Sequence, residues 1–173
     1  MRRVELFKGD ITKVKADAIV NAANSTLLGG GGVDGAIHRG AGHELLEFCK
    51  SLNGCNTGEA KISPGFKLPA KFIIHTVGPV WKGGEYNEDF LLASCYNNSF
   101  KLASENNIKS MAFPSISTGI YSFPTERAAK IAIRETEKFL NADTNLRKVI
   151  FVCFDDKTHN IYRSILYGEL SLS

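Results

Sequence analysis

The sequence predicts an α/β fold in which helices cover both faces of a mostly parallel sheet. Short, continuously apolar runs, which are typical of buried strands, alternate with longer segments whose apolar residues recur every three or four positions. Residues 148–154 form the most apolar of these runs, and Ala129, Ala132 and Ile133 show the helical spacing. Buried strands alternating with helices are typical of a parallel sheet between two helical layers.

The elements follow in order from this alternation. Strands are expected at residues 4–7, 18–21, 60–63, 72–77, 110–113 and 148–154. Helical spacing covers residues 35–52, where Gly40 and Gly42 should break or bend the helix. Further helices are expected around residues 92–103, after Thr125 as N-cap, and after Asp155 or Asp156. The helix after Thr125 should present an inner face of Ala129, Ala132, Ile133, Thr136 and Leu140.

Length and composition narrow the class of protein. A chain of 173 residues suits one domain spanning residues 1–173, and we expect a monomer. The net charge of +3 is scattered, with no basic run longer than Arg2-Arg3, so a nucleic-acid partner is not expected. No apolar stretch approaches the roughly 20 residues that span a bilayer, and the charged N-terminus lacks the apolar core of a signal peptide.

The cysteines and histidines indicate neither a disulfide framework nor a metal centre. Cys49, Cys55, Cys95 and Cys153 show no CxxC spacing, and none of the four histidines pairs with a cysteine at ligand spacing. We therefore expect buried reduced thiols, a cytoplasmic location, no metal and no cofactor.

The most informative segment joins Asn21-Ala-Ala-Asn24 to four consecutive glycines at residues 29–32 and to Asp34. Glycine loses more backbone entropy on folding than any other residue, so such a run suggests that the backbone itself approaches a ligand. At a helix N-terminus that ligand is expected to be an anion. A flexible surface loop is the alternative. The glycines formally match GxGxxG, but eight residues separate Asn21 from Gly30, which excludes a dinucleotide fingerprint.

Unusual polar and aromatic residues follow several of the expected strands. Asp10, Asn21 with Asn24, residues 117–121 and Phe154 all fall at carboxyl ends of strands. In open α/β sheets ligands bind at this edge. The glycine-bearing loop at residues 114–121 would then face the first glycine loop, and the two would clamp one extended anion.

Several of these residues have a structural alternative. Asp34 can be an N-cap, worth about 1 kcal/mol, a carboxylate beside bound phosphates that activates or orients water, or both at once. The helix terminus would lower its pKa and a diphosphate would raise it, and the sequence leaves this balance open. Asn21 and Asn24 either satisfy turn backbone or contact ribose or water, and the second reading is favoured.

Other side chains have a similar choice of roles. His38 lies on the same helix side as Asp34, where a structural hydrogen bond is expected, and His75 is expected to be a satisfied core histidine. Glu59 is read as a turn residue rather than a catalytic acid. Phe154 either belongs to the core or stacks on a base.

Taken together, these motifs resemble the macrodomain family, and within it the MacroD type. The resemblance runs in order through nearly the whole chain. Its pieces lie at residues 9–12, 18–24, 29–38, 41–42, 57–60, 68–71, 74–79 and 113–121. It implies a three-layer α/β/α domain with a six-stranded mixed sheet that binds ADP-ribose.

The resemblance also assigns roles to individual residues. Asp10 and the backbone of Ile11 would bind adenine, with Phe154 lining the same pocket. Gly32 and Val33 would cradle the diphosphate from one side, opposite Ser117, Thr118, Gly119 and Ile120. Asn24 would hold the distal ribose, Asp34 with Asn24 would set a water beside it, and Tyr121 would close over it.

The activity implied is hydrolysis of ADP-ribose esters, namely O-acetyl-ADP-ribose and mono-ADP-ribose on Asp or Glu side chains of modified proteins. A binding-only reader and an ADP-ribose 1″-phosphate phosphatase are the alternatives. The adjacent glutamates of glycohydrolases acting on poly-ADP-ribose and the ligands of zinc-dependent macrodomains are absent from the sequence. One departure concerns the second loop, where Ser122 replaces the glycine that usually follows the aromatic residue.

Overall fold

The computed structural model describes residues 3–168, 170 and 172, and its strands form one six-stranded sheet. Across the sheet the order is β1 (Val4–Lys8), β6 (Lys148–Cys153), β5 (Ser110–Phe113), β2 (Ala18–Ala22), β4 (Phe72–Thr76) and β3 (Ala60–Pro64). All neighbours are parallel except β3 and β4. The expected mixed, mostly parallel sheet is confirmed, and each strand falls within one residue of its predicted bounds.

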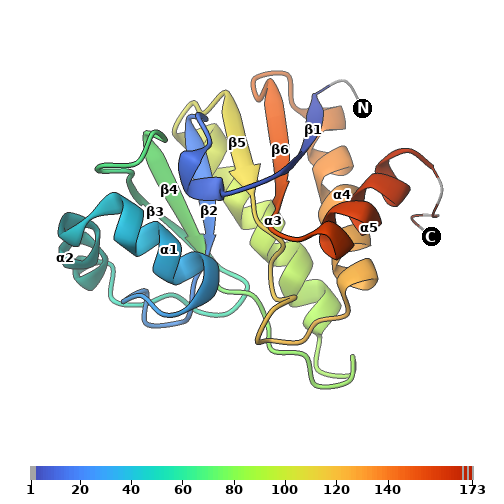
Figure 1. Cartoon of the computed structure of the whole chain (residues 1–173), viewed down its shortest axis with the longest axis horizontal. Helices are drawn as coiled ribbons and strands as arrows, with labels where there is room; N and C mark the ends of the chain where they lie inside the picture. The colour runs from blue at the N-terminus through green and yellow to red at the C-terminus, as the bar shows by residue number, and fades with distance from the viewer. Residues whose placement is uncertain (1–2, 169, 171, 173) are drawn as a thin grey trace.

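Helices cover the sheet on both faces (Figure 1). The short 3-10 helix η1 (Ile11–Lys13), α1 (Gly32–Ala41) and α2 (His43–Ser51) lie on one face. The other face carries α3 (Glu88–Glu105), α4 (Thr125–Ala142) and α5 (Asp156–Leu166). None of the helices in the described part of the chain has the length and apolarity needed to cross a membrane.

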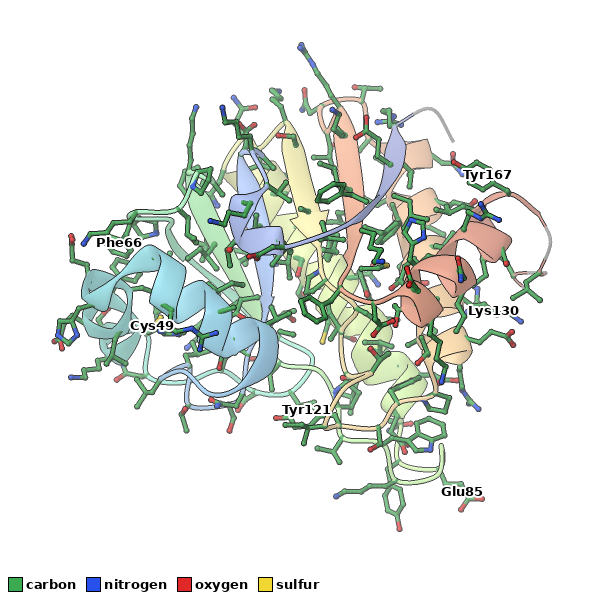
Figure 2. All side chains as sticks on the ribbon, viewed as in Figure 1. Cys49, Phe66, Glu85, Tyr121, Lys130 and Tyr167 are labelled. Atoms are coloured by element: carbon green, nitrogen blue, oxygen red, sulfur yellow. The ribbon has the colours of Figure 1, made fainter. Side chains whose placement is uncertain are left out.

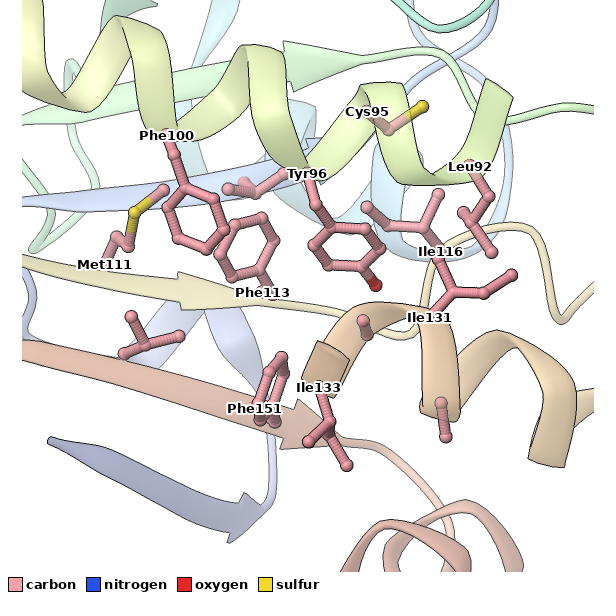
Figure 3. Close-up of a cluster of buried hydrophobic side chains, with 14 of the residues drawn as sticks. Leu92, Cys95, Tyr96, Phe100, Met111, Phe113, Ile116, Ile131, Ile133 and Phe151 are labelled. Atoms are coloured by element: carbon pink, nitrogen blue, oxygen red, sulfur yellow. The ribbon is translucent and has the colours of Figure 1, made fainter. Parts of the chain in front are cut away.

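The four inner strands, β2, β4, β5 and β6, send alternate side chains into two separate cores. Ile19 and Ile73 pack under α1 and α2, whereas Val20 and Ile74 face α3 and α4. The second core is rich in aromatic rings, and Figure 3 shows Tyr96, Phe100, Phe113 and Phe151 gathered between α3, β5 and β6. The predicted inner face of α4 is confirmed, since Ala129, Ala132, Ile133, Thr136 and Leu140 are all buried.

The cysteines follow the expectation from their spacing. Cys49, Cys55, Cys95 and Cys153 are all buried and free. Burial is the main cause that raises the pKa of the Cys49 and Cys95 thiols to about 11. These thiols are therefore inert side chains of the cores.

Helix boundaries differ from the sequence prediction in three places. The predicted break falls at Gly42, whose left-handed φ of +91° separates α1 from α2, while Gly40 stays helical. The first helix begins at Gly32 rather than Gly35. The N-cap of α4 is Pro124 with no side-chain bond, so Thr125 is the first helical residue and its predicted capping role is wrong. Of the two residues predicted to open α5, Asp155 is the N-cap, accepting from the Thr158 N–H at 2.7 Å, and Asp156 is the first helical residue.

Candidate functional site

A two-part cleft lies at the carboxyl ends of β1, β2, β5 and β6. One cavity of about 290 Å³ lies between the segment that follows β2 and the loop that follows β5. A second cavity of about 470 Å³ extends toward the ends of β1 and β6. Gly32 and Val33 line both cavities, so the N-terminus of α1 stands where the two meet. Tyr121, on the β5–α4 loop, lies beyond the strand arrowheads in Figure 2.

The first wall of the cleft is the glycine loop, and its glycines serve different purposes. Gly29 and Gly32 have left-handed φ angles of +93° and +57°, which residues with a Cβ rarely adopt. A Cβ on Gly35 would lie 2.4 Å from the Gly30 carbonyl oxygen, so glycine lets the loop pack on the helix. A Cβ on Gly31 would meet nothing within 4 Å, because the chain there borders open space.

The glycine loop presents free backbone donors to the cleft. The first hydrogen bond of α1 runs from the Gly35 N–H to the Gly31 carbonyl at 3.2 Å. The amides of residues 32–34 therefore precede the intrahelical bonding pattern. Free amides and the positive end of the helix dipole together favour an anion at this point.

The second wall is the loop between β5 and α4, held by backbone hydrogen bonds. The Phe123 N–H donates to the Ser117 carbonyl and the Ser122 N–H to the Gly119 carbonyl, both at 2.9 Å. Ser117 and Ser122 both have left-handed backbones, with φ of +68° and +61°. The family departure at Ser122 therefore puts a side chain where glycine is favoured.

Two neighbours buttress this second wall. The Trp81 N–H donates to the Tyr121 carbonyl at 2.8 Å, which ties the loop to the segment after β4. A Cβ on Gly78 would lie 2.1 Å from Ser117 Oγ, so only glycine allows this contact between the segment and the loop. Among the described residues, Ser117 Oγ is buried without a hydrogen-bond partner.

Asp34 is the most unusual charged group of the cleft. It is only 4% exposed, yet it lines the cavity between the two loops. Its Oδ1 accepts a hydrogen bond from Asn21 Nδ2 at 2.8 Å and lies 3.5 Å from His38 Nε2. Burial raises the pKa of Asp34, against the lowering effects of Asn21 and His38. Asp34 is the third residue of α1, whose N-cap is Gly31, so the predicted alternative of an N-cap is wrong.

The two predicted asparagines have separate positions. Asn24 lines the same cavity as Asp34, while its Nδ2 donates to the Gly29 carbonyl and its Oδ1 accepts from the Thr26 N–H. Asn24 thus holds the turn and faces the cavity at once. Asn21 is fully buried within β2 and does not line the cleft, so the expected direct contact of its side chain with a ligand is not supported.

The larger cavity is mostly apolar with a polar rim. Ile11, Val33 and Val152 contribute apolar surface, and Phe154 borders it with 83% of the residue exposed. Phe154 is thus not a core residue, which leaves an aromatic face available for stacking. Asp10 also lines this cavity, and hydrogen bonds from the side chain and backbone of Thr12 lower its pKa.

The remaining predicted residues are placed as follows. His38 lies beside Asp34, but its Nε2 is buried without a hydrogen-bond partner among the described residues, so the expected structural hydrogen bond is not found at this atom. His75 is a buried core histidine, as expected. Thr118 does not line the cavity, because its hydroxyl lies 2.7 Å from that of Ser115. Glu59 is exposed and lies outside both cavities.

Sequence reasoning missed several residues of the cleft. Gly78 lines the smaller cavity, and Ala36 and Arg39 line the larger. Pro114, Ser115 and Ile116 also line the cleft, within the loop at residues 114–121 that was predicted as one side of the clamp but without a role for these residues. The Gly-Pro pair one residue after β4 is a signal that would have pointed to Gly78. Arg39 carries no such signal, since a single arginine on a helix is normally a solvated residue. The described residues contain no group of three or more His, Cys, Asp or Glu side chains suited to a metal ion.

Fold and site together define a three-layer α/β/α protein with an anion-accepting cleft at the carboxyl ends of its strands. Residues 20–132 match the family model described as Macro domain. The chain therefore belongs to the macrodomain family.

The relatives include proteins with and without a named activity. The chain is 63% identical to a macro domain-containing protein of Methanosarcina mazei over 88% of this chain and 82% of that protein. It is 51% identical to an O-acetyl-ADP-ribose deacetylase of Escherichia fergusonii, with 95% of each covered. Among solved structures, the Trypanosoma brucei macrodomain in complex with ADP-ribose is 43% identical, with a TM-score of 0.90 over 94% of this chain and 68% of that one.

Proposed function

We propose that this macrodomain binds ADP-ribose and hydrolyses esters at its distal ribose. The proposed substrates are O-acetyl-ADP-ribose and proteins that carry mono-ADP-ribose on Asp or Glu side chains. The observation that carries the proposal is Asp34, a buried carboxylate on the cavity wall next to a helix N-terminus that suits phosphate. The named deacetylase and the ADP-ribose complex among the relatives support the same substrate class.

The two cavities suit the two ends of ADP-ribose. The apolar cavity beside Phe154 would take adenine, with Asp10 as an acceptor for its amino group. The diphosphate would lie at the α1 N-terminus, between the backbone of Gly32 and Val33 and that of the Ser117–Ile120 segment. The distal ribose would then reach Asn24 and Asp34, under Tyr121.

The chemistry follows from the position of Asp34. In the deacetylation, Asp34 Oδ2 accepts a proton as water attacks the acyl carbonyl carbon. The ester C–O bond then breaks, acetate leaves, and the ribose oxygen takes a proton. General-base help of this kind contributes about 10²–10⁴-fold to a rate. The remaining acceleration comes from holding ribose, water and carboxylate in register.

The test is a mass-spectrometric time course with O-acetyl-ADP-ribose. We expect wild type to produce ADP-ribose and Asp34→Asn to slow this by about 10²–10⁴-fold, with the Kd for ADP-ribose changing little. Glu105→Gln, at the exposed C-terminal end of α3, is the matched charge-removal control and should keep full turnover.

Each alternative function gives its own result in this experiment. Tight ADP-ribose binding without turnover on either ester substrate would leave a binding-only reader and contradict the hydrolase. Release of inorganic phosphate from ADP-ribose 1″-phosphate, with the esters untouched, would indicate the phosphatase. Equal rates for wild type and Asp34→Asn would remove Asp34 from the mechanism.

We further propose that the protein acts as a single-domain monomer in the cytoplasm. The four buried free thiols fit a reducing compartment. Gel filtration with light scattering would check the monomer, with a mass near 18.9 kDa expected.

A further inference from the structure

A row of buried polar side chains leads from Asp34 into the sheet. Asn21 Nδ2 lies 2.8 Å from Asp34 Oδ1 and 3.1 Å from Nδ1 of His75, which faces Asn21 across the β2–β4 register. Nε2 of His75 lies 2.9 Å from the Ser63 hydroxyl, which donates in turn to the Pro64 carbonyl. Asn21 and His75 are fully buried and Ser63 nearly so, so these groups depend on one another for hydrogen bonds.

When Asp34 is ionised, one arrangement of protons satisfies the hydrogen bonds of this row. The ionised Asp34 carboxylate accepts but cannot donate, so the amide nitrogen of Asn21 must face it. The second hydrogen of that nitrogen reaches His75 Nδ1, which must then be unprotonated. The ring proton of His75 therefore lies on Nε2 and is donated to Ser63 Oγ at 2.9 Å, while the Cys49 thiol of α2 lies farther from the same nitrogen, at 4.0 Å. Burial lowers the pKa of His75 to about 3, which keeps the ring neutral.

The orientation of the Asn21 amide leaves one buried acceptor unpaired, which suggests that this orientation serves a function. Among the described residues, its Oδ1 is buried without any hydrogen-bond partner. An unsatisfied buried acceptor is destabilising and is rare in folded proteins. Reversing the amide would place this oxygen next to the carboxylate of Asp34, and the two acceptors would repel each other. The observed orientation therefore leaves Oδ1 unpaired and preserves the hydrogen bond from Nδ2 to Asp34.

This row determines which oxygen of Asp34 is free. Oδ1 is held by Asn21, whereas the described residues form no hydrogen bond to Oδ2. Oδ2 lies on the side of the glycine loop, since a Cβ on Gly30 would be 3.2 Å from it and 3.3 Å from Asn24 Nδ2. A carboxylate fixed at one oxygen presents the other in a constant direction, which proton transfer from a bound water requires.

We propose that His75 is a positioning residue for the hydrolysis, which acts through Asn21 to hold Asp34 with Oδ2 toward the reacting water. The inference rests on the proposed hydrolase function and deepens it. It replaces the expectation that His75 is only a satisfied core histidine. Ser63 supports the same arrangement by accepting the Nε2 proton.

The test compares His75→Phe with His75→Asn. Phenylalanine keeps a ring but removes the acceptor for Asn21, and asparagine returns an acceptor oxygen near the place of Nδ1. We expect His75→Phe to lower kcat by about 10- to 100-fold with the Kd for ADP-ribose within about twofold, and His75→Asn to recover part of the loss. The acid limb of the kcat profile should move to higher pH in His75→Phe, because the Asn21 bond that lowers the pKa of Asp34 is loosened.

The matched control is Ile73→Val, which loosens the same core two residues earlier on the same face of β4. The side chain of Ile73 has no hydrogen-bonding group and so takes no part in the row, and Ile73→Val should keep kcat and its pH profile. If His75→Phe and Ile73→Val have the same kcat at comparable losses of Tm, His75 is only a core residue and the inference is wrong.

A measurement independent of turnover separates this inference from the function on which it rests. The ¹⁵N shifts of the His75 ring, assigned with the His75→Phe variant, should report a neutral ring protonated on Nε2. A proton on Nδ1 would overturn the positioning role even in an active enzyme. If wild type shows the Nε2 tautomer but does not hydrolyse the esters, the hydrolase function is wrong instead. The positioning role of His75 in hydrolysis would then be wrong as well.

Discussion

The ionised side chain of Asp34 lowers the stability of the fold while it supplies a carboxylate to the cleft. Its carboxylate is almost fully buried, and burial raises its pKa above the ordinary aspartate value. A raised folded-state pKa means that folding favours the protonated form, so the ionised form is a burden at neutral pH. A group retained under such a burden at a cavity wall is a candidate for acid–base work.

The burden on Asp34 gives a prediction about stability. We expect Asp34→Asn to raise Tm at pH 7 by about 2–4 °C, the shift that about 1 kcal/mol gives in a chain of this size. Because the pKa of Asp34 is raised, its favourable contribution is present below the unfolded pKa and is lost as pH rises through the folded one. The gain should therefore vanish in acid. Calorimetry between pH 3 and 8 measures it, and a lower Tm for Asp34→Asn at pH 7 would contradict it.

Ser122 presents a backbone problem at the same scale. Its left-handed φ of +61° disfavours any residue with a Cβ, which is a physical reason for the glycine that the resemblance to the MacroD type leads us to expect there. Relief of that strain should exceed the entropy that glycine adds to the unfolded chain. We expect Ser122→Gly to stabilise the fold by about 0.5–1 kcal/mol, measured by urea unfolding.

Ser122→Ala is the matched control for this measurement. It keeps the strained backbone and removes the weak bond from the serine hydroxyl to the Ile120 carbonyl, so it should not stabilise the fold. An equal gain from Ser122→Ala would show that backbone strain is not the cause.

At the scale of elements, one carboxylate organises the segment that buttresses the second wall. Glu88 opens α3 and accepts hydrogen bonds from the backbone N–H groups of Lys82, Gly84 and Tyr86 at 2.9, 2.9 and 2.6 Å. Burial acts to raise the pKa of Glu88, but these bonds outweigh it and lower the pKa to about 2. The segment it holds begins next to Trp81, which is bonded to the Tyr121 carbonyl.

Removing the charge of Glu88 should loosen this segment. In Glu88→Gln the amide NH₂ replaces one acceptor oxygen, and we expect amide exchange in residues 82–87 to quicken by about tenfold or more. Since the pKa of Glu88 is depressed, its contribution is present above the unfolded pKa and is lost as pH falls toward about 2. The single tryptophan, Trp81, should report this acid transition in wild type by fluorescence and not in Glu88→Gln.

The control for the Glu88 variant lies in the same segment. Glu85 is exposed, and Glu85→Gln should leave both exchange and fluorescence unchanged. If Glu85→Gln and Glu88→Gln behave alike, the hydrogen bonds of Glu88 do not determine the order of the segment.

At the scale of the whole molecule, a ligand bound across both cavities should raise the free energy of unfolding. A ligand that spans both should stabilise the fold by about 2.7 kcal/mol at 100 times its Kd. For a chain of this size that corresponds to a rise in Tm of about 5–10 °C. With both ligands at the same concentration, we expect this rise with ADP-ribose and a smaller one with AMP, which would not reach Asn24 and Asp34 and should therefore bind more weakly. Differential scanning fluorimetry measures it, and equal shifts for both ligands would contradict the assignment of the smaller cavity to the distal ribose.

The sequence predicted the layers and the strands well, because buried parallel strands are continuous apolar runs. It did not predict which strands are neighbours, since pairing such as that of β2 with β5 joins distant parts of the chain. The side-chain direction of Asn21 was missed for a related reason. Asn21 lies inside β2 beside His75, where its side chain is fully buried and bonded to Asp34 and does not itself line the cleft. Asp34 and Asn24 were found because a glycine loop is a local signal.

The pairing of β1 with β6 has a consequence for the order in which the protein matures. Residues near both ends of the chain, from Gly9 to Phe154, line the larger cavity, and they meet only when these two strands pair. A nascent chain therefore carries the glycine loop early but lacks this cavity until its last strand has left the ribosome. Formation of the larger cavity therefore waits for β6, and a chain terminated before this strand would lack that cavity.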